Sequence, residues 1–599
     1  MKKSTKSFLI YILPLFILGG LLIVFADDLY EQFNTQAAEP SVASHPSPTP
    51  QVKSTKLQNK KIIPNTKPAN AVDGFDWSLP ANTAIESNSG LIDEYDRGID
   101  YIRNVFAIVR WDEANPQKGR YDFSRFEKYL TNSVAKKTLV RLEVNSACEA
   151  PKWALKKLRA SKDKSLIFWD KSYLDLLKPF INAFAKRYAN DPRVIGVQLG
   201  IADGEYDDNC EFDNKNGWGE FWMSPQAIAN AQKKFGFTPD KFEKQSKAII
   251  DIYVSAFGKN KGKLAFTNIG PSFSWNSIAE PYNQKLKSIA KYVWKSGIGN
   301  RDGHVEIWMR FIDKVYGVGL LSLEDGSCAM DFNEQYARAI RGRYWGTENE
   351  FYGDKDYVKS ANGPYKNQPY RFLVSSLRAL QMRRNYFSVA GDSMEKMHHP
   401  IYKTQDFLRY LTKVMGKQIE NTPDAFVLLG ERYISQDHAK NFAGEACVKN
   451  SKKGVAVRSF GRWLKEGSRS VPALRVSMPE SENYWGQDYY MPEGMDYEYS
   501  ARKARQFEFD LNDTLTDLRC KNGCKAEIKV TFKDTHKTTM NVWYGDKVSQ
   551  GFKTKGDNKI KTVTFNVNSR FQNNLRGKDF MINSQTTDLT LIMIRVNFL

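Results

Sequence analysis

Short apolar runs alternate with segments of helical period from residue 71 to about residue 420. This alternation is typical of parallel strands joined by helices. We therefore predict eight strand–helix units forming a (β/α)₈ TIM barrel, an α/β fold; an open doubly wound sheet is the alternative, but no glycine-rich dinucleotide loop follows the first run. The expected strands are Gly74–Trp77, Val105–Trp111, Leu139–Asn145, Val194–Gly200, Leu264–Ile269, a weak one near Ile298, Arg343–Thr347 and Phe387–Ala390. The expected helices are Phe123–Ala135, Tyr173–Tyr188, Phe242–Phe257, Ile278–Lys295, Phe372–Arg383 and Thr404–Val414, and Gly317–Asp331 is expected to be an irregular excursion.

The pattern changes after about residue 425, where apolar and polar residues alternate in short runs separated by turn residues. No long helical pattern intervenes, so residues 425–599 are predicted to form an antiparallel β-sandwich. The pattern leaves open whether this domain supports the barrel or binds carbohydrate. Its expected strands are Ala425–Leu429, Val455–Ser459, Phe507–Leu511, Ala526–Phe532, Thr539–Tyr544, Lys561–Asn566 and Leu589–Val596.

The N-terminus carries a long apolar run, residues 8–26, directly after three lysines. Its nineteen uncharged residues are enough to span a bilayer, and the lysines place the N-terminus in the cytoplasm. We expect residues 1–26 to be an uncleaved signal anchor that forms a transmembrane helix. Cleavage after Ala26, which would release the protein, is the alternative, because Val24-Phe25-Ala26 satisfies the small-residue rule. In both cases the bulk of the chain is extracytoplasmic.

Residues 27–70 contain proline, serine, lysine and asparagine but no apolar periodicity, so a disordered linker is expected there. The formal charge of the 599-residue chain is +20. An exported protein meets little nucleic acid, so anionic cell-wall polymers, acidic polysaccharides or the membrane surface are the partners that suit this charge. The basic residues are scattered, however, which fits equally well a lysine-rich surface that only maintains solubility. The oligomeric state is left open.

Export favours disulfide formation, and the six cysteines allow fifteen pairings. Cys148 and Cys210 follow neighbouring predicted barrel strands, and Cys520 and Cys524 could close a small loop. These are the two expected bonds; the pairing of Cys328 with Cys447 rests only on what remains.

Two of the expected barrel strands end in glutamate. Glu205 follows Val194–Gly200 and Glu348 directly follows Arg343–Thr347, and the strand count makes these the fourth and seventh strands. The C-terminal ends of barrel strands form the active-site face. Glycosidases cleave through one carboxylic acid that protonates the leaving oxygen and one carboxylate at the anomeric carbon. We therefore predict Glu205 and Glu348 as the catalytic pair of a glycoside hydrolase.

Two segments resemble the clan A glycoside hydrolases, retaining (β/α)₈ enzymes that include the β-galactosidase-like families. Residues 111–123, Trp-Asp-Glu-Ala-Asn-Pro-Gln-Lys-Gly-Arg-Tyr-Asp-Phe, are similar to the family signature Trp-x-x-x-Glu-Pro-x-x-Gly-x-Tyr-Asp-Phe, and residues 188–198 are similar to the approach to the fourth strand. The resemblance covers about residues 71–420 and implies acid/base and nucleophile on strands four and seven. The chain departs from the pattern at Asn115, where the family usually has Glu, and at Gly204, where many members have Asn.

Other residues near the strand ends could bind sugar hydroxyls or stack on pyranose faces. Arg110 and Trp111 could orient a carboxylate nucleophile, and Glu350 lies two residues beyond Glu348. The expected substrate-binding residues are Arg110, Trp111, Glu143, Asn145, Asp203, Trp218, Trp275, Trp345, Glu350 and Asp392. No zinc-ligand spacing, phosphate loop or serine-nucleophile elbow occurs, so neither a metal nor a cofactor is predicted.

The sequence therefore predicts a membrane-anchored, retaining glycoside hydrolase that acts on an extracellular or cell-wall poly- or oligosaccharide. The alternative is a catalytically inactive carbohydrate-binding surface protein on the same barrel, because a fold does not determine a function. A transglycosylase would use the same carboxylates. We expect Glu348 rather than Glu350 to be the nucleophile, because Glu348 lies where the strand ends and Gly346 would leave space beneath a sugar.

Overall fold

The computed structural model describes the folded part of the chain from residue 71 onward. It covers residues 71–94, 96–133, 137–161, 164–200, 210, 225–268, 280–302, 318–322, 328–349, 368–389, 399–434, 455–467, 474–477 and 499–599. No helix within these ranges is both long and apolar enough to cross a membrane. The expected membrane helix and linker, residues 1–70, lie outside them.

Eight parallel strands close into a barrel, each hydrogen-bonded to the next around the ring. Ordered along the chain they are β2 (Gly90–Asp93), β3 (Asn104–Arg110), β4 (Lys137–Glu143), β5 (Val194–Gln198), β6 (Leu264–Asn268), β7 (Gly299–Asp302), β10 (Trp345–Asn349) and β11 (Tyr386–Val389). The predicted TIM barrel is confirmed, and β5 and β10 are its fourth and seventh strands.

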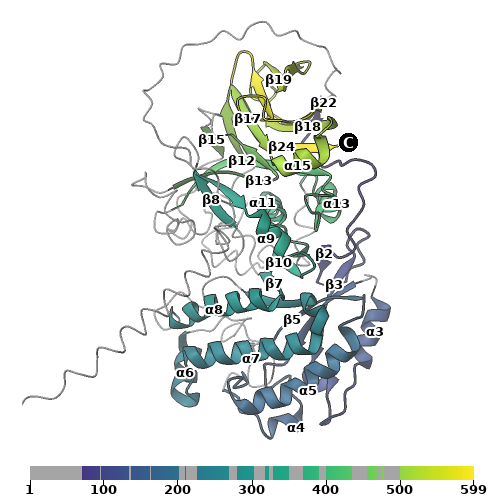
Figure 1. Cartoon of the computed structure of the whole chain (residues 1–599), viewed down its shortest axis with the longest axis vertical. Coiled ribbons are helices and arrows are strands. Elements are labelled where there is room, and N and C mark those ends of the chain that lie inside the picture. The colour runs from purple at the N-terminus through teal and green to yellow at the C-terminus, as the bar shows by residue number, and fades with distance from the viewer. Residues whose placement is uncertain are drawn as a thin grey trace, which may run out of the picture. The chain divides into compact units, whose positions relative to one another are not determined.

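Amphipathic helices cover the outside of the barrel, and Figure 1 shows α5, α7 and α8 lying along its strands. The ends of α7 follow from local chemistry. The Thr238 side chain accepts a hydrogen bond from the Lys241 amide, Pro239 takes the first helical position, and Gly258 stops the helix with a φ of 52°. The helices are α2 (Trp111–Ala114), α3 (Ser124–Asn132), α4 (Lys152–Leu155), α5 (Lys171–Tyr188), α6 (Pro225–Phe235), α7 (Pro239–Phe257), α8 (Glu280–Ser296), α9 (Glu334–Ala339), α11 (Gln368–Gln381) and α13 (Thr404–Val414).

The prediction for the first barrel strand was wrong. The segment Gly74–Trp77 is not in the barrel; it follows β1 (Val72–Asp73), which pairs antiparallel with a strand near the C-terminus, β22. Its apolar residues Phe75 and Trp77 are buried because their rings pack against Tyr402, Phe407 and Tyr410. The true first strand has only two apolar residues between Gly90 and Asp93, too short a run to produce a pattern.

Within the described residues, the other strands form a ten-stranded sheet, antiparallel except for the parallel pair β9 and β13, and a six-stranded antiparallel sheet. Apolar residues of both sheets, such as Ile528 and Ile594 of one and Phe509 and Ile582 of the other, belong to one buried core, as in a sandwich. The elements are β8 (Val318–Ser322), β9 (Cys328–Phe332), β12 (Asp424–Ile434), β13 (Val455–Arg462), β14 (Leu464–Glu466), β15 (Leu474–Ser477), β16 (Ser500–Ala504), β17 (Gln506–Leu511), α15 (Asp513–Cys520), β18 (Cys524–Lys533), β19 (Thr539–Tyr544), β20 (Lys547–Val548), β21 (Phe552–Lys553), β22 (Ile560–Ser569), β23 (Phe580–Ser584) and β24 (Leu589–Phe598).

The stretch Gly317–Asp331 was predicted to be irregular, and this too was wrong. It contains β8 and β9, which pair antiparallel with each other, and β9 then pairs with β13, with Cys328 opposite Val457. A segment between two barrel strands thus extends the ten-stranded sheet.

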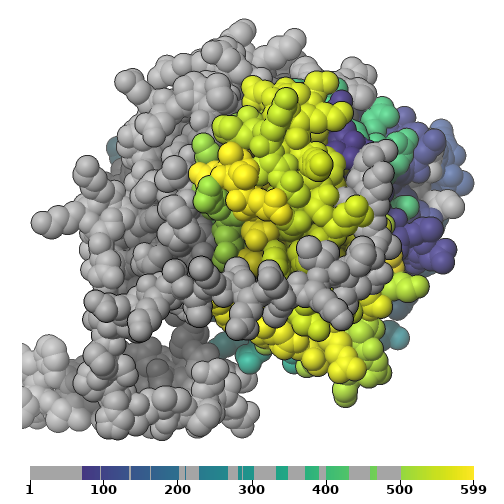
Figure 2. All heavy atoms as spheres, turned by 90° about the horizontal axis from the view of Figure 1, so that it is seen from above, coloured from purple at the N-terminus to yellow at the C-terminus, as the bar shows by residue number. Residues whose placement is uncertain are grey.

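Barrel helices and antiparallel strands share one hydrophobic core. Leu377 of α11 and Phe407 of α13 belong to the same buried cluster as Phe426 of β12, Ile592 of β24 and Phe75 near the start of the described chain. Figure 2 shows purple residues of that early segment beside yellow-green residues of the C-terminal part. The antiparallel sheets are therefore packed on the barrel by apolar contact, not merely tethered to it.

Candidate active site

The register of the barrel identifies the side chains that point inward. Leu139, Ala265 and Tyr386 belong to the cluster inside the barrel. Side chains two apart on a strand share a face, so Arg141 and Glu143 lie on the inner face of β4 with Leu139. Arg141 pairs in register with Gln198, and Glu143 with Arg110. The inner face thus changes from apolar to polar toward the C-terminal ends of the strands.

Arg110 ends β3 and lies half-buried at this rim. Its guanidinium donates to both carboxylate oxygens of Asp112 at 3.2 Å and to the backbone oxygen of Cys148 at 2.7 Å. These contacts hold the side chain toward the loop that follows β4. The expected role of Arg110 in orienting a nucleophile stays a prediction.

Glu143 is a half-buried carboxylate at the end of β4, opposite Arg110 in register. Within the described part of the chain its side chain has no hydrogen-bond or ion-pair partner. A carboxylate with unused acceptors on the inner rim can take sugar hydroxyls, as predicted for this residue.

Asn145 does not have the open position expected of a substrate-binding residue. It is buried, and its Oδ1 accepts a hydrogen bond of 2.9 Å from the Tyr173 hydroxyl. Its amide lies against Gly200, where an added Cβ would meet the Asn145 Nδ2 at 2.8 Å and the Leu142 backbone oxygen at 2.7 Å. Asn145 is therefore enclosed within the fold beside Gly200, where only glycine leaves room for its amide.

A disulfide joins Cys148, in the loop after β4, to Cys210, beyond β5, with the Cα atoms 5.5 Å apart. This is the predicted pairing, as is Cys520 with Cys524, with the Cα atoms 4.6 Å apart. Glu205 lies outside the described residues, five residues along the chain from both Gly200 and Cys210. Cys447, expected to pair with Cys328, lies outside the described residues.

Glu348 occupies a position near the end of β10, opposite Ser388 of β11 in register. The space at Gly346, which we expected to lie open beneath a sugar, is instead filled by the ring of Tyr344. A Cβ at Gly346 would meet that ring at 2.6 Å, and a Cβ at Gly196 would meet its other edge at 2.5 Å. Tyr344 also stacks on Tyr386 with ring centroids 4.7 Å apart. Because Gly196 and Gly346 have no side chains, the stacked rings of Tyr344 and Tyr386 fit inside the barrel below the site.

Two predicted sugar-stacking tryptophans are core residues. Trp111 is fully buried and packs on Tyr173 and Phe180 of α5. Trp345 is 4% exposed and lies under the guanidinium of Arg384, 4.4 Å from the ring centroid. Trp345 faces outward from β10, and Trp111, the first residue of α2, continues the outward alternation of β3. Their rings therefore fill the layer between barrel and helices and cannot meet a substrate on the inner face.

The remaining predicted site residues lie outside the described residues. These are Asp203, Glu205, Trp218, Trp275, Glu350 and Asp392, and only the backbone of Glu348 is described. The sequence reasoning missed three inward polar residues, Arg141, Gln198 and Arg301. Gln198 and Arg301 are both buried, and the register places Arg301 opposite Gly346. Strand alternation from Gly196 and Gly299 was the signal that could have found them. Among the described residues, no cluster of three or more His, Cys, Asp or Glu side chains could hold a metal ion.

No protein-family model and no curated protein sequence matches the chain. The catalytic domain of a β-amylase from Paenibacillus polymyxa is similar in structure, with 9% identity over 55% of this chain and 100% of that one and a TM-score of 0.36. A β-galactosidase from the psychrophilic Marinomonas ef1 has 11% identity over 54% of this chain and 60% of its own, with a TM-score of 0.31. A GH30 endoxylanase from Clostridium papyrosolvens C71 has 8% identity over 87% of this chain and 99% of its own, with a TM-score of 0.30. TM-scores this low are weak likenesses, so the assignment of the fold rests on the closed parallel barrel itself.

Proposed function

We propose that the protein is a retaining glycoside hydrolase that acts on an extracellular or cell-wall poly- or oligosaccharide. The observation that carries this proposal is the position of two glutamates in the barrel. Glu205 follows the fourth strand and Glu348 lies on the seventh, and the C-terminal ends of strands are where barrel enzymes keep their catalytic groups. The missed first strand does not change the count, because Gly90–Asp93 replaces it.

In this proposal Glu348 attacks the anomeric carbon while Glu205 protonates the leaving oxygen. A covalent glycosyl-enzyme forms, and Glu205 then removes a proton from the water that hydrolyses it. The half-buried Glu143 carboxylate on the inner face of β4 supports the proposal, because it is able to bond sugar hydroxyls. We expect the Glu205 and Glu348 carboxyl groups to lie about 5–5.5 Å apart, the retaining distance.

Trapping with a slow fluorosugar tests the nucleophile. An activated 2-fluoroglycoside, chosen by screening aryl glycosides with the full chain, should label Glu348, and Glu348→Gln should abolish labelling. Glu350→Gln should keep labelling while weakening substrate binding. A label on Glu350, or a turned-over substrate with no label on either residue, would overturn the assignment.

Rescue separates the acid/base from a binding residue. Glu205→Gln should lower kcat about 10²–10⁴-fold on a substrate with a poor leaving group and much less on one with a good leaving group, with azide restoring turnover. Glu143→Gln is the matched control, because it should raise KM without azide rescue. Saccharide binding without turnover of any substrate would favour the inactive carbohydrate-binding alternative.

We further propose that residues 8–26 anchor the protein in the membrane with the barrel outside. The nineteen uncharged residues behind lysines support this orientation. Protease treatment of intact cells should remove the barrel. Survival of the barrel on intact cells, with digestion only after lysis, would show the orientation to be wrong.

A further inference from the structure

A pocket of about 320 Å³ lies outside the ring of barrel strands, between residues 76–79 and helix α13. Trp77 and Tyr410 contribute its aromatic wall, with their ring centroids 5.1 Å apart. The Trp77 indole is fixed by a hydrogen bond of 2.7 Å to the Tyr402 backbone oxygen. This hydrogen bond orients the Trp77 ring in the wall.

The helix side of the pocket carries three cations, Lys403, Arg409 and Lys413. Arg409 pairs with Asp406 at 3.4 Å and lies over the ring of Tyr101. Lys403 and Lys413 are half-buried, and neither ammonium group has a hydrogen-bond or ion-pair partner in the described part of the chain. Two partly desolvated ammonium groups without counter-ions form a positive site.

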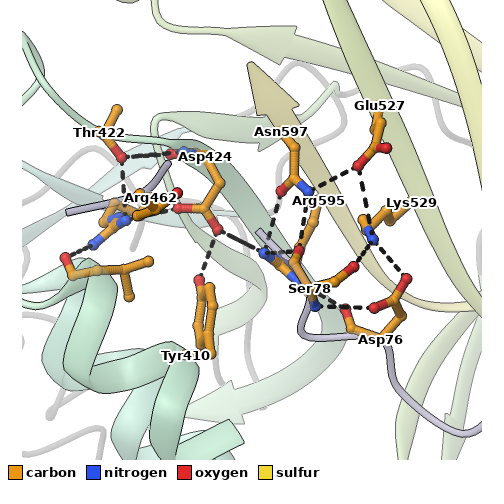
Figure 3. Close-up of polar contacts among 12 residues, drawn as sticks. Asp76, Ser78, Tyr410, Thr422, Asp424, Arg462, Glu527, Lys529, Arg595 and Asn597 are labelled. Carbon is orange, nitrogen blue, oxygen red and sulfur yellow. Dashed lines mark hydrogen bonds and ion pairs between the residues drawn. The ribbon is translucent and has the colours of Figure 1, made fainter. Parts of the chain in front are cut away.

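The inner side of the pocket does not supply the missing negative charge. Asp76 lines the pocket, but its carboxylate is bound to the buried Lys529 ammonium at 2.5 Å (Figure 3). Burial would raise the pKa of Asp76, yet hydrogen bonds from Lys529 and Ser78 outweigh burial and hold that pKa below its usual value. Asp76 thus stays ionised and is already neutralised.

Beyond Asp76, the buried network continues through Arg595, Arg462, Asp424 and Glu527 (Figure 3). Asp424 is shared by both arginines, at 2.9 Å from Arg462 and 3.2 Å from Arg595. Pocket and network together contain six cations, Lys403, Arg409, Lys413, Arg462, Lys529 and Arg595, and four carboxylates, Asp76, Asp406, Asp424 and Glu527. The excess of two positive charges equals the charge of Lys403 and Lys413, whose ammonium groups have no partner among the described residues.

Lys403 has φ 47° and ψ 59°, a left-handed conformation that residues with a side chain adopt infrequently. The residue precedes α13, and its carbonyl accepts a hydrogen bond from the Phe407 amide. The Lys403 side chain lines the pocket from this position, at the start of α13.

We propose that this pocket binds an extended polyanionic glycan, such as a chain of uronic acid units, at a site separate from the barrel's inner rim. Lys403 and Lys413 are ten residues apart, which is about 15 Å along a helix. A chain with negative groups on successive units meets both lysines, whereas a single small anion reaches both only if both side chains stretch toward it. A concave site between two segments also suits a polymer strand better than the flat surface of a bilayer.

The site lies close to where the chain enters the folded unit, because Asp76 is five residues from Ala71, the first described residue. A polymer bound in this pocket would keep the folded part of the protein close to the membrane, to which the expected linker connects it. This proposal does not depend on the proposed catalysis, since binding is measured without turnover.

Fluorescence anisotropy of labelled oligogalacturonate with the full chain tests the proposal. Lys403→Gln/Lys413→Gln should weaken binding about tenfold at low ionic strength, and rising salt should reduce the difference. Lys178→Gln/Lys186→Gln is the matched control: it removes the same charge from two exposed lysines eight residues apart on α5, which have no ion-pair partner among the described residues. The control should stay within about twofold of the wild type. Equal melting temperatures would show that all variants are folded.

Equal weakening by the two double variants would mean that only the overall positive charge acts, and an unchanged affinity of Lys403→Gln/Lys413→Gln would mean that the pocket is not used. Either result overturns the proposal. Inorganic phosphate that competes as well as the oligomer, at equal charge concentration, would instead indicate a single-ion site. If the protein instead bound phosphatidylglycerol vesicles more tightly than phosphatidylcholine vesicles, lost this binding in Lys403→Gln/Lys413→Gln, and did not bind oligogalacturonate, the ligand would be a lipid surface. Both of these outcomes also contradict the polyanionic glycan.

Discussion

Asp424 is the residue whose removal should most disturb the junction between barrel and antiparallel sheets. Its side chain is completely buried and contacts the guanidinium groups of Arg462 and Arg595 and the hydroxyl of Tyr410, at 2.9, 3.2 and 2.8 Å (Figure 3). These partners come from β13, β24 and α13. Asp424→Asn keeps the shape of the side chain but leaves two buried cations without their shared carboxylate.

The size of the loss follows from what the arginines retain. Removing one partner of a buried ion pair costs about 3–5 kcal/mol. Arg462 still donates to the Val414 backbone oxygen and Arg595 to the Asp76 backbone oxygen, so we expect the lower end, about 3 kcal/mol. With a urea m-value of about 3 kcal/mol/M, the midpoint should fall by about 1 M.

Urea unfolding of the full chain, followed by tryptophan fluorescence, measures this change. Asp517→Asn, an exposed carboxylate on α15, is the matched control and should shift stability by less than about 0.5 kcal/mol. Asp424→Asn/Arg462→Met should recover part of the loss, because one stranded cation is then removed with the carboxylate. A loss from Asp424→Asn no larger than that of the control would refute the view that this cluster holds the junction.

Three further changes test other parts of the fold. Burial raises the pKa of Asp579 to about 6, so the folded protein binds that proton more tightly than the unfolded chain, and stability should fall as pH rises from about 4 to about 6. Melting temperatures of Asp579→Asn should lack this fall, and a wild-type-minus-variant difference that is constant with pH would contradict it. Gly346→Ala should cost about 1–3 kcal/mol in urea unfolding through its clash with the Tyr344 ring, and Tyr344→Leu in the same chain should restore part of that loss; no restoration would exclude the clash as the cause. Cys148→Ser and Cys210→Ser should each lower thermal stability by the same amount, about 2–4 kcal/mol, because the disulfide closes a 62-residue separation, and unequal losses would point to other contacts of one cysteine.

Local periodicity was sufficient to predict much of the barrel. Thr404–Val414 was predicted as a helix and is α13 with the same bounds, and β3 begins one residue before its predicted start. The failures occur where a partner distant in sequence decides the structure. The strands β8 and β9 lack a strong pattern of their own, and β9 pairs with β13, more than a hundred residues further along.

The candidate site was predictable to the level of strand ends but not of side-chain direction. Trp111 was expected to face a sugar, yet it continues the outward series of Ala107 and Val109, which belong to the buried cluster between strands and helices. Applying strand alternation from the interior residue Phe106 would have assigned Trp111 to the core. Arg301 was missed for the opposite reason, because β7 reads Gly-Asn-Arg-Asp and contains no apolar residue to mark it as a strand.

The position of β24 constrains when the molecule can complete its fold. This strand, Leu589–Phe598, lies in the interior of the ten-stranded sheet, between β18 and β12, and its Arg595 holds the backbone of Asp76. Until residues 589–598 have been synthesised and translocated, β24 cannot pair. The edge of β18, which pairs with β22, and the edge of β12, which pairs with β13, then have no strand between them. The junction with the barrel therefore forms late, and until then the exposed edges are open to aggregation. A nascent chain of this kind needs protection until its final described strand is free to insert.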